Sequence, residues 1–391
     1  MRYVVLGGAG AMGRITVRDL FETADRAEIL IADYNFKNAQ RLARFYHSPR
    51  VKAALVDVLD IQATSHLLRG SFAVINSVQY EFNLHVMRAA LKAGVHYLDL
   101  GGLFHMTRKQ LKLHSKFKKA GLTAILGIGA APGITNVLAR FAADRLDRVR
   151  GIHIRLGSVD ETKVLNPPPL SSSYSIQTIL EEFSYPPAVF AKGKFQFVEP
   201  MSGEEAVNFP KPVGRQHPMY TIHSEVATLP LTYRNEGIRD VSFKIAFDRD
   251  FTEKIRFLRD IGLASEKGVT VDGIKIIPRD LLVRLIRALP RPVVKGPLKE
   301  YEVIRVVVKG RKNGKAQTWI VDCHTRGMPK WGIGLDIDTG SPPSIAAQML
   351  ARGEIKARGA VPAEVAVNPQ PFFAELKKRN LRVRYRRVDA S

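Results

Sequence analysis

The chain has few of the features on which secreted and membrane proteins depend. It contains one cysteine, Cys323, so no disulfide can form within it and no thiolate metal cluster is available. The apolar run at residues 3–6 ends at Gly7, which is too short for the core of a secretory signal. The longest later apolar stretch, residues 121–134, is interrupted by four glycines and Pro132 and does not suit a membrane span. We therefore expect a cytoplasmic protein with no membrane partner.

Acidic residues are also scarce. The chain has 37 Asp and Glu against 60 Lys and Arg, a formal net charge of +23. Such an excess suits nucleic acid, anionic membranes or acidic small molecules as partners. The dense basic segment at residues 108–119 carries apolar residues at helical spacing, which indicates the solvated face of an amphipathic helix. Neither this segment nor the one at 379–387 has aromatic-interleaved or zinc-finger spacing, so we expect no nucleic-acid partner. The ten histidines show no metal-ligand spacing, so we expect no metal site.

A glycine-rich stretch at the amino terminus organises the sequence. Residues 3–6 read as a buried strand, Gly8-x-Gly10-x-x-Gly13 follows, and apolar residues then recur at helical spacing. In a dinucleotide-binding turn the first glycine allows the tight bend, the second lets the backbone approach the pyrophosphate, and the third lets helix and strand pack closely. A second strand, residues 28–33, ends in Asp33, twenty residues past Gly13, where a carboxylate accepts hydrogen bonds from a ribose. This pattern predicts a dinucleotide site.

Strands and helices alternate through the first third of the chain. We expect strands at residues 53–58, 72–76, 96–100 and 122–127, and helices at 36–46, 61–68, 83–93, 104–120 and 136–146. This alternation predicts an α/β fold with a doubly wound parallel Rossmann sheet. Ligands of such sheets lie at the carboxyl ends of the strands. Besides the three glycines, the predicted cofactor-binding residues are therefore Ala11, Met12, Asp33, Tyr34, Asn35, Asp57, Val58, Asn76, Ser77, Val78, Gln79, Asp99 and Pro132.

The pattern changes after residue 150, where an inserted α+β domain with a mostly antiparallel sheet is predicted. Alternating strands are expected at residues 152–156, 195–198, 241–247, 301–308 and 317–321, the last two joined at Asn313-Gly314 as a hairpin. Helices are expected at 176–182, 251–261 and 279–289, and a lid or linker at 166–173. Helices at 345–351, starting after Pro342 and Pro343, and at 371–378 are expected to return to the Rossmann domain. The predicted domains are 1–132 (dinucleotide-binding), 133–339 (substrate-binding and dimerisation) and 340–391 (C-terminal helices).

Several further segments carry a family resemblance over nearly the full length. They are residues 97–102 (YLDLGG), 130–136 (AAPGITN), 201–205 (MSGEE), 220–225 (YTIHSE), 228–230 (TLP) and 346–355 (AAQMLARGEI). Together with the glycine stretch they resemble the saccharopine dehydrogenase-like family, and within it the lysine 6-dehydrogenases most of all. The resemblance implies a nicotinamide-dependent oxidoreductase acting at a carbon–nitrogen bond of an amino acid. It also implies a split Rossmann domain closed by the C-terminal helices, and a homodimer built through the inserted sheet.

Three residues are candidates for catalysis. Hydride loss from a CH–NH group requires a neutral amine, so a base must lie near the nitrogen. Asp99, which ends a strand beside two glycines, suits the junction of cofactor and substrate; alternatively it caps the following turn. His223 and Glu225 lie in an alternating stretch and are expected on the same side of a strand, where they hold an ammonium and relay a proton. The alternative is that Glu225 merely orients a buried His223.

The substrate and cofactor leave further candidates. A substrate carboxylate favours Arg155, Arg215 or Lys244, each of which is otherwise a surface charge, and Tyr174 is a candidate from a closing lid. Asp33 favours NAD because a carboxylate there repels a 2′-phosphate. Lys37 and Arg41 lie close enough in sequence to leave NADP open.

These observations give one first hypothesis and two alternatives. The first is an NAD-dependent enzyme of the lysine 6-dehydrogenase type, oxidising the 6-amine of L-lysine to the semialdehyde or its cyclic imine. The second is a saccharopine reductase or a carboxynorspermidine dehydrogenase-like enzyme, which joins an amine to an aldehyde. A saccharopine pocket should converge several Arg or Lys groups on three carboxylates, whereas a lysine pocket needs one cation and an acidic partner. The third is a non-catalytic NAD-binding sensor.

Overall fold

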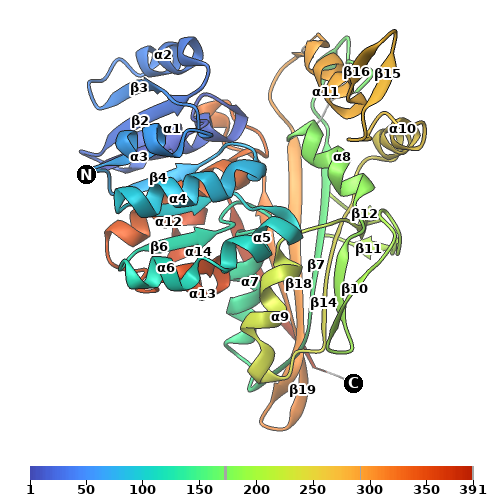
Figure 1. Ribbon diagram of the computed structural model, residues 1–391. Helices are drawn as coiled ribbons and strands as arrows, with labels where there is room; N and C mark the ends of the chain where they lie inside the picture. Colours follow the sequence, from blue (N-terminus) through green and yellow to red (C-terminus); the bar gives the residue numbers. More distant parts are fainter. Residues whose placement is uncertain (171–173, 291, 390–391) are drawn as a thin grey trace.

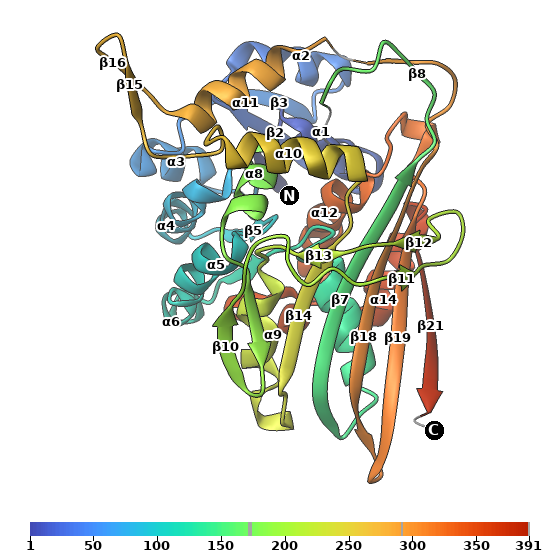
Figure 2. The ribbon, with the colours of Figure 1, turned by 90° about the vertical axis from the view of Figure 1, so that its right-hand side faces the viewer.

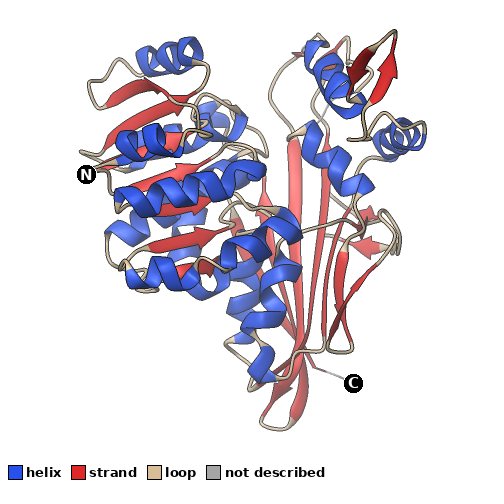
Figure 3. Ribbon diagram, in the orientation of Figure 1, coloured by secondary structure: helices blue, strands red, loops and turns tan. Residues whose placement is uncertain are grey.

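Two β-sheets lie side by side and organise the molecule (Figure 1). The computed structural model describes residues 1–170, 174–290 and 292–389. In Figure 3 the first sheet has helices on both faces, whereas the long strands of the second carry their main helices on the side of the first sheet. The α/β fold predicted from the sequence, with an inserted sheet domain, is confirmed. The predicted domain boundaries at residues 132 and 339 remain predictions.

The first sheet has seven parallel strands in the order β20-β6-β5-β4-β1-β2-β3. They are β1 (Arg2–Leu6), β2 (Glu28–Asp33), β3 (Val51–Leu55), β4 (Ala73–Asn76), β5 (His96–Asp99), β6 (Thr123–Leu126) and β20 (Gly359–Pro362). Successive residues of β1 face two separate apolar cores, as expected for a sheet covered on both sides. The strand order reverses between β1 and β4, which places a ligand crevice at the carboxyl ends of these strands.

Most helices of this half follow the predicted ranges. They are α1 (Ala11–Thr23), α2 (Phe36–Phe45), α3 (Ile61–Leu68), η1 (Tyr80–Phe82), α4 (Asn83–Ala93), α5 (Leu103–Leu111), α6 (His114–Lys119) and α7 (Ile134–Ala143). The single helix predicted at 104–120 is wrong, because the chain turns at Lys112 and Leu113, whose N–H groups bond to carbonyls three residues earlier. That tighter turn ends α5 and starts α6.

The second sheet is mixed, with the path β10-β9-β14-β7-β18-β19-β21 and β13 paired to β14. Only β14 and β7 pair in parallel. Asn313 and Gly314 have φ of 49° and 74° and form the predicted hairpin turn, so that prediction is confirmed. The strands are β7 (Arg148–Asp160), β9 (Ala188–Ala191), β10 (Lys194–Phe197), β13 (Met219–Tyr220), β14 (Asp240–Ile245), β18 (Glu300–Lys312), β19 (Lys315–Thr325) and β21 (Arg382–Asp389).

The two faces of this second sheet are covered differently. The near face, toward the Rossmann sheet, packs against α7 and α9 (Glu225–Thr232) through Ile154, Phe243 and Ile304. The far face carries the hairpin of β11 (Val207–Asn208) and β12 (Arg215–Gln216), whose Phe209 lies over Gly157. Because side chains alternate along a strand, two consecutive residues of β7 point to opposite faces of the sheet, and the same holds for β14.

The carboxyl-terminal segment returns to the first sheet, as predicted. The helix expected after Pro342 and Pro343 begins earlier, as α12 (Ile337–Ala351), and both prolines lie inside it. Pro342 and Pro343 have no N–H, so the helical bonds to the carbonyls four residues earlier are missing there. The Ser341 hydroxyl donates to the Ile337 carbonyl at 2.7 Å just before this interruption. The segment also contains α13 (Ala363–Ala366), α14 (Pro369–Lys378), and the strands β20 and β21, which the sequence analysis did not predict.

Buried polar contacts hold α12 and α14 to α1. Thr16 donates to the Gly340 carbonyl at 2.7 Å. Arg379, which is 1% exposed, donates to both carboxylate oxygens of Asp19 at 2.7 and 2.9 Å. Separating a buried ion pair leaves uncompensated charges and costs free energy of folding. These contacts therefore hold the carboxyl-terminal segment against α1 as one packed unit.

The remaining elements form a smaller group beside the upper end of the second sheet. Figure 2 shows the hairpin of β15 (Val269–Val271) and β16 (Ile274–Ile276) projecting from the molecule. The predicted helices at 176–182, 251–261 and 279–289 correspond to α8 (Ile176–Ser184), α10 (Arg249–Asp260) and α11 (Pro278–Ala288). Part of the predicted lid or linker, residues 171–173, lies outside the described residues. The group also includes β8 (Val164–Leu165), β15 (Val269–Val271), β16 (Ile274–Ile276) and β17 (Val293–Val294), while η2 (Arg234–Glu236) and η3 (Pro329–Trp331) lie elsewhere.

Candidate active site

The glycine turn has no room for side chains. A Cβ on Gly13 would lie 2.2 Å from the Gly7 carbonyl oxygen, and one on Gly8 would lie 2.8 Å from that of Val5. Gly10 caps the start of α1 without a side chain, and the first turn contains no acidic residue. The first N–H groups of α1, from Ala11 on, therefore have no capping side chain and favour an anion, so this turn fits a pyrophosphate.

Asp33 is held beside this turn. It is 7% exposed and accepts hydrogen bonds from the N–H groups of Asn35 at 2.9 Å and Ala9 at 3.2 Å. Tyr34, in contrast, is 83% exposed. The carboxylate is thus oriented at the end of β2, where an adenosine ribose is bound in this fold.

The other predicted cofactor residues lie after β3, β4, β5 and β6. The Asn76 Oδ1 and Ser77 Oγ atoms are buried and lack a hydrogen-bond partner in the described chain, which fits a polar ligand. Gln79 instead donates to Gln177 of α8 at 2.8 Å. Pro132 packs into the space left by Gly101 and Gly127. The segments carrying Asp57, Val58 and Val78 also follow strand ends, and Asp57 Oδ1 accepts from the Leu59 N–H at 2.9 Å.

Asp99 has its hydrogen-bonding capacity filled by the protein. It is 1% exposed and accepts from the Tyr97 hydroxyl at 2.8 Å, the Gly101 N–H at 2.9 Å, the Gly127 N–H at 2.7 Å and the Gln110 amide. Burial raises the pKa of this carboxyl, and the four donors oppose that rise. This geometry favours the alternative of the sequence analysis, in which Asp99 caps the following turn through Gly101. The bond from Gly127 also holds the loop after β6, which was not predicted.

His223 and Glu225 come together with two residues that lie far away in sequence. His223 Nδ1 is 2.8 Å from Glu225 Oε2, and Nε2 is 3.6 Å from Glu182 Oε1. The Tyr174 hydroxyl donates to the other oxygen of Glu182. We call these four residues the His223 cluster. The predicted strand at this point is wrong: β13 ends at Tyr220 and Glu225 begins α9, so the contact arises from a turn before a helix.

The surroundings of His223 favour a positively charged ring. Burial alone lowers the pKa of His223, but Glu225 and Glu182 outweigh it and raise the pKa to about 9. The ring stacks on Phe243 at 3.6 Å between centroids, and Thr135 donates to Glu225 Oε1 at 2.8 Å. At neutral pH the imidazolium therefore carries a proton on each nitrogen. The Nδ1 proton faces Glu225 closely, whereas the Nε2 proton has only the longer contact to Glu182.

The structure does not bring the predicted carboxylate-binding cations to this cluster. Arg155 and Lys244 are partners across β7 and β14 and both bind Glu205, the lysine at 3.1 Å. They lie on the far face, because Phe243, which contacts His223, occupies the near face one residue before Lys244. Arg215 belongs to the far-face hairpin and is exposed. The alternation of these strands was the sequence signal that separates the two faces.

Glu181 and Arg279 were not predicted from the sequence; Glu181 links α8 both to Tyr80 of the Rossmann half and to Arg279 of α11. Glu181 accepts from the Tyr80 hydroxyl at 2.8 Å and from Arg279 at 3.0 Å. Burial raises the pKa of Glu181, and its donors oppose that effect. The signal for Glu181 and Glu182 was two adjacent glutamates on a helix whose Ile176, Ile179, Leu180 and Phe183 define a buried face.

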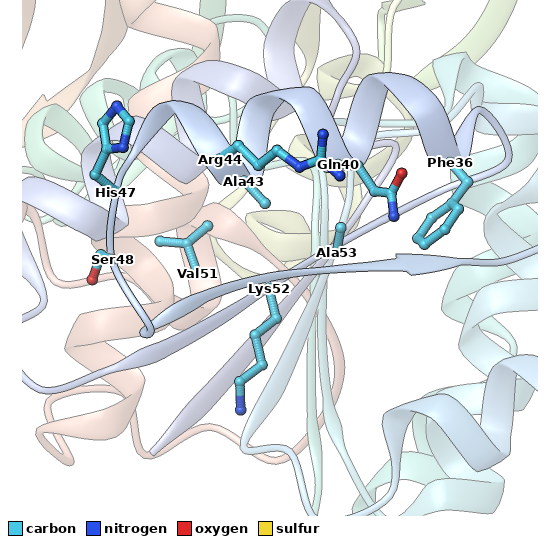
Figure 4. A pocket seen from close by; sticks show the side chains of 9 residues that line it. All are labelled: Phe36, Gln40, Ala43, Arg44, His47, Ser48, Val51, Lys52 and Ala53. Atoms are coloured by element: carbon cyan, nitrogen blue, oxygen red, sulfur yellow. The ribbon is translucent and has the colours of Figure 1, made fainter.

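A separate groove of about 390 Å³ lies between α2 and β3 (Figure 4). None of its lining residues belongs to the His223 cluster; they are Phe36, Gln40, Ala43, Arg44, His47, Ser48, Val51, Lys52 and Ala53. Within residues 1–170, 174–290 and 292–389, no group of three or more His, Cys, Asp or Glu side chains is placed to hold a metal ion. Across the same ranges, the structure contains no helix with both the length and the apolar character needed to cross a bilayer.

A glycine-turn dinucleotide site beside a buried histidine–carboxylate cluster defines the class of the protein as a nicotinamide-dependent oxidoreductase. The saccharopine dehydrogenase NADP binding domain matches residues 3–125, and the saccharopine dehydrogenase C-terminal domain matches residues 129–381. The chain therefore belongs to the saccharopine dehydrogenase family, as the resemblance indicated, and its cofactor is NAD or NADP.

Two curated relatives match most of the chain, and a third matches part of it. Carboxyaminopropylagmatine dehydrogenase from Synechocystis sp. is 26% identical, over 97% of this chain and 96% of the relative. Carboxynorspermidine synthase from Vibrio cholerae is also 26% identical, over 94% and 92%. Saccharopine dehydrogenase [NADP(+), L-glutamate-forming] from Saccharomyces cerevisiae is 28% identical, over 38% of this chain and 32% of the relative.

Two solved structures share the fold over nearly the full length. Apo saccharopine dehydrogenase from Saccharomyces cerevisiae has a TM-score of 0.74 at 18% identity, covering 99% of both chains. Homospermidine synthase from Legionella pneumophila in complex with NAD has a TM-score of 0.69 at 14% identity, covering 100% of this chain and 92% of the other. At these identities the likeness establishes the fold alone.

Proposed function

We propose that this enzyme joins a primary amine to an aldehyde and reduces the resulting C=N bond with NADH or NADPH, forming a secondary amine. The proposed amine carries more than one positive charge, and the proposed aldehyde is that of an amino acid. The names of the two nearly full-length relatives, carboxyaminopropylagmatine dehydrogenase and carboxynorspermidine synthase, support this choice. We prefer it to the lysine 6-dehydrogenase hypothesis, which no relative reported above carries in its name.

The charge of the His223 cluster carries the proposal. Glu182 and Glu225 are 2% and 0% exposed, and both face His223, so the cluster holds two carboxyl groups for one imidazole. Arg155 and Lys244, the predicted partners of a substrate carboxylate, are bound to Glu205 on the far face. A substrate with three carboxylates needs several converging cations, whereas a polyamine needs acids. This contrast favours a cationic amine over saccharopine.

The chemistry assigns His223 the role of general acid. The amine nitrogen attacks the aldehyde carbon, and breaking the carbinolamine C–O bond requires a proton on the departing oxygen, which leaves as water. The Nε2 proton of His223 has the longer of the two contacts, 3.6 Å to Glu182, so we assign it to this step. Glu225 stabilises the imidazolium and fixes its orientation. When bound, the nicotinamide supplies the hydride that reduces the carbon of the C=N bond.

The cofactor would be held by the turn at Gly8, Gly10 and Gly13 with the start of α1, and its adenosine ribose by Asp33. We retain the preference for NAD that Asp33 carries. Asp99 is assigned a positioning role through the loops after β5 and β6. The homodimer and the cytoplasmic location remain predictions.

The test is a panel of mono-, di- and triamines, each paired with amino-acid semialdehydes, followed by absorbance of NADH and NADPH. We expect reduced cofactor to be consumed with at least one di- or triamine pair. His223→Asn should lower kcat by about 100-fold or more while NADH binding, followed by fluorescence, is retained. Oxidation of L-lysine with no coupling of any pair would overturn the proposal in favour of lysine 6-dehydrogenase. Cofactor binding without any turnover would indicate the sensor.

A further inference from the structure

A second pair of carboxyl groups, Glu302 and Asp338, lies close to the His223 cluster and has no role in the steps above. Glu302 is on β18, two residues before Ile304, which belongs to the near face. Residues two apart along a strand point to the same side, so Glu302 also occupies the near face. Asp338 is in the first turn of α12. Their side chains form a hydrogen bond with each other, which two carboxyl groups do only by sharing a proton.

In the part of the chain that the structure describes, this pair has no cationic partner. Asp338 is 4% exposed; its Oδ1 accepts from the Thr339 hydroxyl at 3.2 Å, but its Oδ2 has no hydrogen-bond donor in the described chain. Among the described residues, no Lys, Arg or His forms an ion pair with either carboxyl. The titratable groups around the pair are themselves acidic or neutral: Asp336, Cys323 and Tyr174. Burial raises the pKa of both Glu302 and Asp338.

The pair lies between the cofactor turn and the His223 cluster. Tyr174 binds Glu182 of that cluster and also interacts electrostatically with Glu302. On the other side, Thr339 lies against Gly129, and Gly340 packs on Ile15 and the Met12 carbonyl of α1. A group bound at Glu302 and Asp338 is therefore close to both the nicotinamide-binding half and the proposed acid.

We propose that Glu302 and Asp338 bind the distal ammonium or guanidinium group of the amine substrate, while the reacting nitrogen lies at the His223 cluster. This inference rests on the proposed function. Asp338 is buried with one oxygen that has no donor, which is costly, and a multiply charged amine supplies N–H donors at that place. The shared proton leaves when the cation binds, so both carboxylates accept hydrogen bonds in the complex. A monoamine cannot reach both places, so this pair selects diamines and longer polyamines.

The experiment compares 1,4-diaminobutane and agmatine with butylamine in the wild type and in Glu302→Gln, Asp338→Asn and the double variant. We expect KM for the two doubly charged amines to rise about 10- to 100-fold, with kcat within about threefold of the wild type. The KM for butylamine and the Kd for NADH should not change. Glu253→Gln on the exposed surface of α10 is the matched control for loss of one negative charge and should behave as the wild type.

Calorimetry of 1,4-diaminobutane binding to the NADH-loaded protein, in two buffers of different ionisation enthalpy, separates this inference from the proposed function. Saturable diamine binding with proton release, lost in the double variant, supports the subsite even if no aldehyde is turned over. A wild type that couples amines, beside variants in which KM is unchanged or rises equally for butylamine and the diamine, overturns the subsite alone. Circular dichroism melting shows whether each variant is folded, and we expect no loss of Tm on replacing these two acids.

Discussion

Glu225→Gln tests the proposed acid most directly, because it removes a charge and keeps the shape of the side chain. Glu225 contacts His223 Nδ1 at 2.8 Å and is fully buried, so its charge acts on the ring with little screening. The variant leaves Glu182 in place at 3.6 Å from Nε2. We therefore expect His223 to lose part, but not all, of the stabilisation of its charged form.

The expected size follows from the environment of the ring. The pKa of His223 is raised from 6.5 to about 9, which corresponds to about 3 kcal/mol in favour of the imidazolium. An opposite charge this close shifts the pKa of a neighbouring group by about 1–3 units. The pKa of His223 in Glu225→Gln should therefore fall to about 8 or below. Because the folded pKa is the raised one, the stability that His223 contributes is complete below about pH 6.5 and is lost as the pH rises through about 9.

Two measurements check this prediction. In kcat/KM profiles between about pH 6 and 10, the alkaline limb should move to lower pH in Glu225→Gln by at least about one unit. The amine substrate also titrates in this range, but it does so equally with both proteins, so the difference reports the enzyme. NMR titration of labelled histidine, assigned with His223→Asn, measures the pKa without turnover. An unchanged limb and an unchanged NMR pKa would refute the assignment of His223 as the acid.

Three further predictions concern the cofactor turn and the carboxyl-terminal segment. Gly13→Ala should abolish NADH binding in a fluorescence titration, whereas Gly94→Ala, where a Cβ meets nothing within 4 Å, should leave it intact; binding by both would contradict the steric argument. Asp33→Ala should weaken NADH far more than NADPH, and an equal loss would count against ribose recognition. Asp19→Asn removes the fully buried carboxylate of Arg379 and leaves it only the partly exposed Glu375, so it should lower the free energy of unfolding in urea by about 3 kcal/mol. Glu22→Gln, which removes a partly exposed ion pair, should cost less than about 1 kcal/mol, and a similar loss in the two variants would argue against the buried pair.

The parallel sheet was predictable because its signals are local. Buried apolar runs, the glycine turn and Asp33 lie in sequence next to the elements that they define. The strands β20 and β21 were not predictable in the same way. Gly359–Pro362 is short and contains proline, and Arg382–Asp389 reads as a basic run because its arginines are exposed. Each becomes a strand only because β6 or β19 offers a free edge, which is a long-range property.

The site was predicted in part for the same reason. His223 and Glu225 meet as expected, although a turn and a helix start bring them together instead of a strand. Glu182 joins them from a helix about forty residues earlier in the chain, and no local pattern pairs it with His223. The faces of β7 and β14 were a different matter, because strand alternation alone separates Arg155 and Lys244 from Phe243. The position of these two cations on the far face was therefore predictable from the sequence.

One sheet separates charges of opposite sign, which makes the proposed cationic substrate compatible with a net charge of +23. On the far face Lys244, Arg155 and Arg305 lie in register on three adjacent strands. Glu205 pairs with Lys244 and Arg155, and Asp322 pairs with Arg305. Glu302 and the glutamates of the His223 cluster lie on the near face with fewer cations than acids. The backbone and apolar layer between the faces keep the two sets from pairing. The site can therefore be acidic because its cations are bound elsewhere, and net charge carries no information about the ligand.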